Sequence, residues 1–155
     1  MKRQILVAVL LLAAFHATAD TIPGRVVGIM DGDTILVLTT EYNQKRVRLA
    51  EIDAPEKKQP FGAKSKQALS ELCFKKHVIV KVVDTDLYGR LVGKVSCEGT
   101  DANRSQVESG MAWVYRRYAK DPALGDAETM AKTGKRGLWA DPSPIPPWEW
   151  RKNRK

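Results

Sequence analysis

Five short apolar segments, separated by turn-forming residues, constrain the fold of this chain more than any other feature of its sequence. They predict strands over residues 21–30, 34–39, 46–52, 78–83 and 91–95. After the third segment, Leu69, Leu72 and Cys73 recur at helical spacing and predict a helix over residues 63–74. The chain therefore combines a small set of strands with at least one inserted helix.

Two further helices are expected in the second half of the chain. One covers residues 103–109, and the other starts at Asp121-Pro122 and runs toward Gly134. We expect the four prolines within residues 142–147 to prevent any later helix. This pattern predicts an α+β, mainly β fold with about three helices, built as a five-stranded barrel of the OB type. A generic α+β sheet fits the same order of elements.

The first 19 residues have the three parts of a secretory signal peptide: a basic start, an apolar run over residues 5–15 and the sequence Ala17-Thr18-Ala19 before Asp20. The apolar run is too short to span a bilayer, and an uncleaved interfacial anchor is the alternative. We therefore expect a signal peptide over residues 1–19, one domain over residues 20–140 and a basic tail over residues 141–155. Export would place the protein in the periplasm or the medium, without membrane attachment after cleavage.

The formal net charge of +8 is unevenly distributed. Residues 1–19 contain Lys2, Arg3 and no acid, so the remaining chain carries +6, and four of these charges lie in residues 151–155. The rest of the mature chain, residues 20–150, is left with +2, which is weak support for nucleic-acid binding. The tail, with Trp148 and Trp150 beside its cations, could grip nucleic acid without sequence preference. A solvated terminus whose tryptophans pack on the domain is the alternative.

Histidine and cysteine are too few for several classes of site. Two cysteines exclude a four-cysteine zinc site, and cleavage of the signal peptide would leave His77 as the only imidazole. Acid–base catalysis by two histidines is therefore excluded. In an oxidising compartment, Cys73 and Cys97 can form a disulfide, and two buried thiols are the alternative.

Three polar motifs at expected turns and strand ends carry the candidate chemistry. In Asp31-Gly32-Asp33-Thr34, two carboxylates flank a glycine, a pattern that suits a hard cation and also an ordinary hairpin turn. In Arg48-Leu49-Ala50-Glu51-Ile52-Asp53-Ala54-Pro55-Glu56, the proline favours an extended Ala54 and can expose its carbonyl, whereas Arg48 could simply form a surface salt bridge with Glu51 or Glu56. In Asp86-Leu87-Tyr88-Gly89-Arg90, the guanidinium fork matches phosphate oxygens, although an ordinary loop arginine is equally compatible.

Taken together and in this order, the three motifs resemble the thermonuclease family, which includes staphylococcal nuclease. The similarity continues through Gly110-Met111-Ala112-Trp113-Val114-Tyr115 and Gly137-Leu138-Trp139 and so covers about residues 22–140. The resemblance implies an OB fold and calcium-dependent hydrolysis of DNA and RNA to 3′-phosphate products. It also implies roles for six residues: Asp33 and Asp53 as calcium ligands, Ala54 as a ligand through its carbonyl, Glu56 as the general base or the group that orients water, and Arg48 and Arg90 as phosphate-binding residues.

The resemblance is less direct for contacts with the substrate. Tyr88 matches a tyrosine near the 5′ phosphate, while Leu87 stands where a basic residue is common. Tyr115 or Tyr118 could stack on a base; we favour Tyr118, which could instead cover the core. The sequence thus predicts an exported, monomeric endonuclease that acts on DNA and RNA. The alternative is a catalytically inactive OB-type module that binds nucleic acid.

Overall fold

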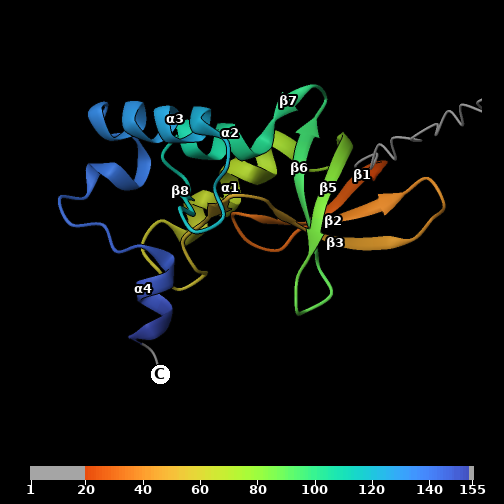
Figure 1. The fold of residues 1–155 in the computed structure, drawn as a ribbon, viewed down its shortest axis with the longest axis horizontal. Helices are drawn as coiled ribbons and strands as arrows, with labels where there is room; N and C mark the ends of the chain where they lie inside the picture. The colour runs from red at the N-terminus through yellow and green to blue at the C-terminus, as the bar shows by residue number, and fades with distance from the viewer. Residues whose placement is uncertain (1–19, 154–155) are drawn as a thin grey trace, which may run out of the picture.

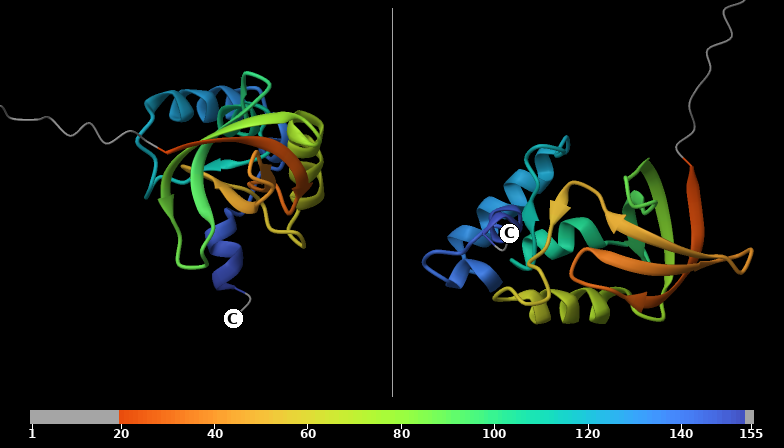
Figure 2. Two further views of the ribbon diagram at one scale, coloured as in Figure 1. Left: turned by 90° about the vertical axis from the view of Figure 1, so that its right-hand side faces the viewer. Right: turned by 90° about the horizontal axis from the view of Figure 1, so that it is seen from below.

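Strand pairing closes the β segments into a barrel (Figure 1, Figure 2). The computed structural model describes residues 20–153, so the predicted signal peptide lies outside the described residues. The barrel strands are β1 (Thr21–Ile29), β2 (Thr34–Thr39), β3 (Gln44–Leu49), β5 (His77–Thr85) and β6 (Leu91–Cys97), in the spatial order β3-β2-β1-β5-β6. Neighbours in this order are antiparallel, and a parallel pairing of β3 with β6 closes the barrel. The expected five-stranded OB-type barrel is confirmed.

The barrel interior is filled by apolar side chains that alternate along the strands. On β2, Ile35 and Val37 are fully buried, whereas the intervening Leu36 is partly exposed, as the two-residue period of a strand requires. The register shifts between Val26 and Gly28 on β1 and again on β5, and such irregularities bend strands enough to close a small barrel. The alternating apolar residues thus fill the interior of a closed sheet that has no long unpaired edge strand in the described part of the chain.

Three helices cover the barrel and its open end. In α1 (Gly62–Cys73) and α2 (Ala102–Glu108), Leu69 and Val107 enter the same core as the strands. Helix α3 (Pro122–Thr133) packs on α2 and begins where Asp121 accepts a hydrogen bond from the Ala123 amide. A 3₁₀ turn, η1 (Gly137–Ala140), follows α3. Three short strands complete the fold: β4 (Ile52–Asp53) pairs with β8 (Trp113–Val114), and β7 (Thr100–Asp101) pairs antiparallel with the end of β6.

The third strand ends earlier than its sequence predicts. It was expected to continue through Ile52, but β3 stops at Leu49 because Glu51 adopts a left-handed conformation with φ of 66°. The chain therefore turns before β4. This turn brings the segment of Asp53 and Ala54 next to the loop between β1 and β2, where the Ala54 amide donates to Asp33.

A fourth helix forms where the prolines were expected to prevent one. Helix α4 (Pro147–Lys152) has Pro147 at its first position, where a missing amide hydrogen is harmless and the fixed φ favours the helix. The Trp148 ring stacks on the Tyr115 ring, with centroids 5.4 Å apart and planes 3° apart. Trp148 also meets the edge of Trp113 at 5.8 Å. The expectation of no further helix was wrong because it ignored the first-turn tolerance for proline.

Cys73 at the end of α1 and Cys97 at the end of β6 form a disulfide. Both side chains are buried in the main core. Of the two alternatives that the sequence left open, the structure therefore contains the bonded pair. The bond links the end of α1 covalently to the end of the barrel strand β6.

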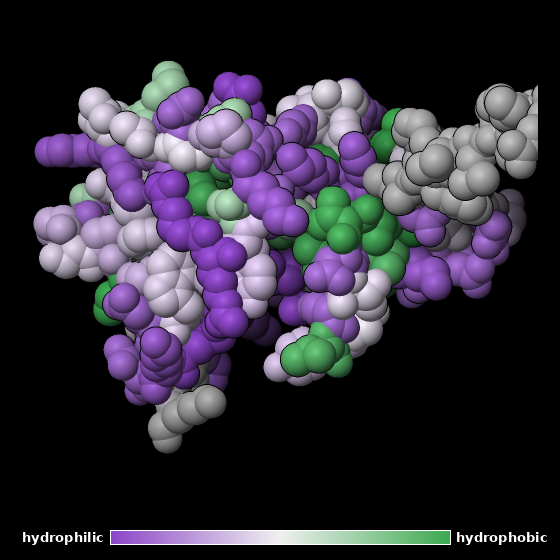
Figure 3. Space-filling model, viewed as in Figure 1, coloured by the Kyte–Doolittle hydropathy of each residue, from purple (hydrophilic) through white to green (hydrophobic). Residues whose placement is uncertain are grey.

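The surface is mostly hydrophilic, with a hydrophobic area over the barrel strands (Figure 3). Ile79 and Val83 on β5 contribute to the exposed apolar surface, each with more than half of its area exposed. Within residues 20–153, none of the helices is long and apolar enough to cross a membrane.

Candidate active site

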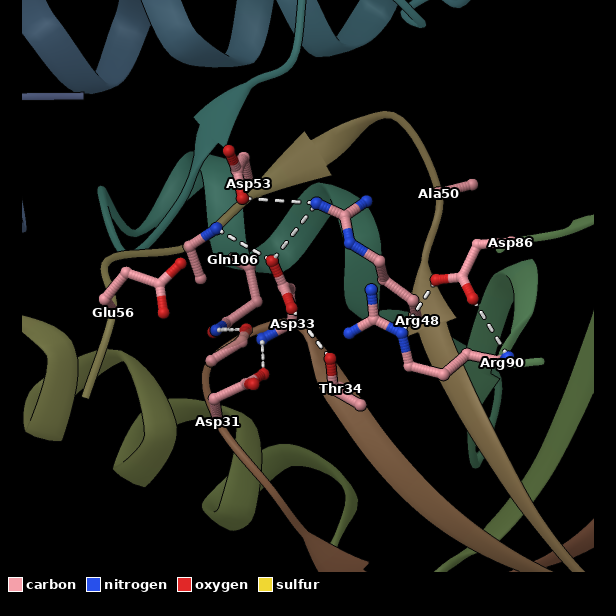
Figure 4. Close-up of polar contacts among 12 residues, drawn as sticks. Asp31, Asp33, Thr34, Arg48, Ala50, Asp53, Glu56, Asp86, Arg90 and Gln106 are labelled. Carbon is pink, nitrogen blue, oxygen red and sulfur yellow. Dashed lines mark hydrogen bonds and ion pairs between the residues drawn. The ribbon is translucent and has the colours of Figure 1, made fainter. Parts of the chain in front are cut away.

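Two buried aspartates lie together at the edge of the barrel (Figure 4). Asp33 stands just before β2 and Asp53 lies on β4, and their exposed fractions are only 6% and 2%. Asp33 accepts hydrogen bonds from the Thr34 hydroxyl at 2.9 Å and from the Ala54 amide at 3.0 Å. The contact with Ala54 fixes the second carboxylate motif against the first, across 21 residues of sequence.

Arg48 lies between the two carboxylates. Its Nη2 atom is 3.2 Å from Asp53 Oδ1 and 3.6 Å from Asp33 Oδ2. The register of β2 and β3 pairs Arg48 with Thr34, which explains why the arginine reaches this point. It is therefore an integral part of the acidic cluster rather than a partner of Glu51 or Glu56 in a surface salt bridge.

Arg90 reaches the same region from the loop between β5 and β6. Its Nε donates to Asp86 Oδ2 at 2.7 Å, and its backbone amide donates to Asp86 Oδ1 at 3.0 Å. Burial acts to raise the pKa of Asp86, but the hydrogen bonds from Arg90 outweigh it and hold that pKa below its usual range. The carboxylate thus orients Arg90, whose guanidinium points into the same space as that of Arg48 (Figure 4).

Glu56 follows Ala54-Pro55 and is partly exposed. Its backbone amide donates to Gln59 Oε1 at 3.0 Å, which fixes the loop after Pro55. Its carboxylate accepts a hydrogen bond of 2.6 Å from Arg151 of α4. Sequence reasoning placed Arg151 in a basic tail and gave it no role at this site.

The acidic cluster carries negative charge in a poorly solvated place. Burial first, and then the neighbouring Asp33 carboxylate, raise the pKa of Asp31 to about 7. Burial also raises the pKa of Asp53; the Arg151 hydrogen bond opposes this effect and the charge of Asp33 adds to it. A positive ion at this position would offset both the burial of these carboxylates and their mutual repulsion.

The residues present suit a hard divalent cation such as Ca²⁺. Asp33 and Asp53 offer carboxylate oxygens as ligands. The Arg151 guanidinium already binds Asp53, so this carboxylate accommodates a positive charge. Within residues 20–153, no three acidic, histidine or cysteine side chains converge as a complete ligand set. A cation here would therefore also need backbone oxygen, for which Ala54 is adjacent, and water.

Gln106 of α2 is a site residue that sequence reasoning missed. Its Nε2 donates to the carbonyl oxygen of Gly32 at 2.6 Å and to that of Ser65 at 3.1 Å, in a fully buried position. A side chain at position 32 would collide with Ser65, so the glycine allows close approach of α1 rather than only a sharp turn. No motif in the sequence marks Gln106, because its role depends on a contact 74 residues away.

The predicted substrate tyrosines lie in different environments. Tyr88 is 85% exposed in the loop before Arg90, whose guanidinium carbon lies 5.6 Å from the tyrosine ring centroid. Tyr118 is 54% exposed and contacts Tyr115 edge to face at 4.9 Å. Because Trp148 stacks on Tyr115, Tyr118 is the more available of this pair.

A basic groove of about 600 Å³ lies on the loop after Glu56. Phe61 lies on its wall with the Lys64 ammonium 4.9 Å from the ring centroid. The groove also includes Lys57, Lys58 and Trp150. Cationic and aromatic groups in this combination suit a phosphate backbone and its bases.

Comparison with known proteins identifies relatives of this chain. A family model described as "Staphylococcal nuclease homologue" matches residues 46–141. An "Uncharacterized endonuclease" from Escherichia coli O157:H7 is 41% identical over 150 residues, covering 96% of this chain and 97% of the relative. A "Micrococcal nuclease" from Shigella flexneri is 41% identical over 164 residues, covering 99% of this chain and 93% of the relative. A "Probable staphylococcal-like nuclease" from rice is 40% identical over 119 residues, 77% of this chain and 35% of that protein.

Proposed function

We propose, from the premise that this chain belongs to the family of staphylococcal nuclease homologues, that it is a calcium-dependent endonuclease of low sequence specificity. Its coarse activity is that of a nuclease, a hydrolase that acts on nucleic acids. The finer proposal is that it cuts both DNA and RNA and leaves 3′-phosphate ends. We further propose that it acts as an exported monomer.

The observation that carries the proposal is the placement of two arginines beside two buried aspartates. Arg48 contacts both Asp33 and Asp53, and Asp86 orients Arg90 into the same space. A phosphodiester is anionic and gains further charge on its equatorial oxygens in the transition state. Two fixed guanidinium groups stabilise that charge more than they stabilise the substrate.

The carboxylates have two separate roles, metal binding and proton transfer. Asp33, Asp53 and the Ala54 carbonyl would hold Ca²⁺, which when bound acts as a Lewis acid toward phosphate oxygen and water. Glu56, on the loop beside the buried pair, takes a proton from the attacking water. The water oxygen forms a bond to phosphorus as the bond to the 5′ oxygen breaks, giving a 3′-phosphate and a 5′-hydroxyl. Arg90 or a water molecule supplies the proton to the departing oxygen.

Low sequence specificity follows from the kind of contacts that the site offers. Arg48, Arg90 and the lysines of the basic groove would face phosphates, which are common to all sequences. Tyr88 and Tyr118 offer ring faces that can stack on any base. Export would also separate such an unselective activity from the genome of the cell that makes it.

The decisive experiment incubates the purified protein with single-stranded DNA in millimolar calcium and, in parallel, with a calcium chelator. We expect cleavage only with calcium, and 3′-phosphate ends on the products. Glu56→Gln should lower turnover by about 10²- to 10⁴-fold, the usual contribution of a general base. Glu71→Gln, an exposed change on α1, is the matched control and should cut normally. Tight binding without cleavage under either condition would instead support the inactive OB-type module.

A further inference from the structure

Helix α4 places a guanidinium group on the carboxylates that the proposed chemistry needs. Arg151 Nη2 lies 2.7 Å from Asp53 Oδ2, and Nη1 lies 2.6 Å from Glu56 Oε1 and 3.3 Å from Asp53 Oδ1. These partners are separated from Arg151 by 98 and 95 residues. One arginine therefore joins the proposed metal ligand to the proposed general base.

The contact depends on a docked helix and not on a free side chain. The Trp148 ring stacks on Tyr115 and meets the edge of Trp113, which anchors the first turn of α4. Just before the helix, the Ile145 carbonyl accepts a 2.6 Å hydrogen bond from Gln59. The same Gln59 accepts from the Glu56 amide, so α4 and the Glu56 loop are fixed to one another.

Arg151 and a divalent cation compete for the same negative charge. A cation bound to Asp53 would lie within a few ångströms of the guanidinium, and like charges at that separation repel. The Arg151 fork also uses a Glu56 oxygen that must be free to accept a proton from water. The site therefore has two incompatible occupants, one built into the chain and one from solution.

We propose that α4 is an intramolecular lock in which Arg151 holds Asp53 and Glu56 until Ca²⁺ displaces it. The inference rests on the proposed function, because it assigns Asp53 and Glu56 the roles given there. In the locked state the protein binds neither the cation nor the attacking water productively. Calcium binding shifts the population toward a state in which Arg151 has left the carboxylates, and the apparent calcium affinity is reduced by the fraction of locked molecules.

The test measures calcium binding itself, without nucleic acid, by isothermal titration calorimetry of the full protein. Arg151→Gln should bind Ca²⁺ about 10-fold more tightly than the wild type, as expected when a state populated at about 90% is removed. Lys152→Gln removes the same charge from the same helix without touching the carboxylates, and should bind as the wild type does. Equal or weaker binding by Arg151→Gln would overturn the lock.

A second variant tests the lock through the docking of α4. Trp148→Ala removes the stack on Tyr115 while keeping Arg151, and it should also tighten calcium binding. Unchanged affinity in this variant would show that helix docking does not control the site. If the wild type cuts DNA with calcium and Arg151→Gln binds the ion no better, the lock fails while the nuclease proposal stands. If neither protein binds calcium, the calcium-dependent function fails as well.

Discussion

The side-chain amide of Gln106 lies 2.6 Å from the carbonyl oxygen of Gly32, midway between the two aspartates of the first site motif. Gln106 is on α2, and Gly32 is in the turn between β1 and β2. The same amide donates to the backbone of α1 at Ser65, so three separate segments meet at one buried side chain. The position of Asp33 thus depends on a helix that contributes no charged group to the site.

Gln106→Leu should therefore destabilise the protein and weaken the site together. Loss of the amide leaves the Gly32 carbonyl buried without its side-chain donor, which costs about 1–3 kcal/mol of unfolding free energy. Urea denaturation measures this loss, and calorimetry should show weaker calcium binding. Gln67→Leu, an exposed change on α1, is the control for the substitution itself and should alter neither quantity. Wild-type stability in Gln106→Leu would show that the turn between β1 and β2 does not depend on the Gln106 hydrogen bond.

The disulfide between Cys73 and Cys97 should supply a large share of the stability. It closes a loop of 24 residues, and loop-closure entropy predicts a loss of about 3 kcal/mol when both cysteines are replaced by alanine. The measurement is the difference in urea-unfolding free energy between the oxidised wild type and the double variant. Reduction of the wild type should reproduce most of the loss. A double variant as stable as the wild type would mean that the buried contacts of α1 alone fix this helix.

Arg90 should matter for turnover more than for stability. Arg90→Ala removes one of the two guanidinium groups that would face the phosphate in the proposed mechanism, and should lower kcat by about 10²- to 10³-fold. Thermal unfolding should change little, because Arg90 is a loop residue whose side-chain partner is Asp86. Arg104→Ala breaks another i,i+4 ion pair, the more exposed one with Glu108 on α2, and should keep normal kcat. Near-normal turnover in Arg90→Ala, with the fold intact, would remove Arg90 from the mechanism.

Local patterns made the barrel and most site residues predictable, because strands, turns and charged motifs are determined by residues that are close in the sequence. The strand over Thr34–Thr39 has the predicted bounds, and the helix after Asp121 begins where its cap and proline indicate. The early end of β3 was not predictable, because it depends on a left-handed Glu51 whose carboxylate accepts from the amides of Lys120 and Asp121. Backbone amides about 70 residues away stabilise this turn, so no local sequence pattern indicates it.

The same distinction separates the predicted from the unpredicted part of the site. Asp33, Arg48 and Asp53 were identified from short motifs, and the structure brings them within contact of one another. Gln106 and Arg151 were missed because each acts through a contact across more than 70 residues. A composition-based interpretation of the tail counted Arg151 as one charge among four, whereas its effect comes from where α4 docks.

The raised pKa of Asp31 predicts an unusual dependence of stability on pH. With a pKa of about 7 in the folded protein and 3.8 ordinarily, the folded state keeps a proton that the unfolded chain releases. The cation-free protein should therefore lose stability as pH rises from about 4 to about 7, and then level off. Asp31→Asn cannot release this proton, so its stability relative to the wild type should grow by on the order of 1 kcal/mol between pH 5 and pH 8. Urea unfolding in chelator measures the difference, and a constant difference across this range would contradict the assignment.

Leu87 offers a gain of function, because the resemblance to the thermonuclease family implies that a basic residue is common at this position. The side chain is fully exposed beside Tyr88 in the loop that ends at Arg90. Leu87→Lys adds a cation where a phosphate would pass, and should bind single-stranded DNA about threefold more tightly at low salt. The slope of log affinity against log salt should steepen by about 0.7, the release of one counterion from a single strand.

Two controls separate this contact from a general charge effect. Leu87→Gln gives a polar side chain without charge and should leave the salt slope unchanged. Tyr42→Lys adds the same cation to another exposed position, on the turn between β2 and β3. An equal gain from Tyr42→Lys would mean that DNA responds to net charge alone. A gain confined to Leu87→Lys would place the substrate strand along the loop that carries Tyr88 and Arg90.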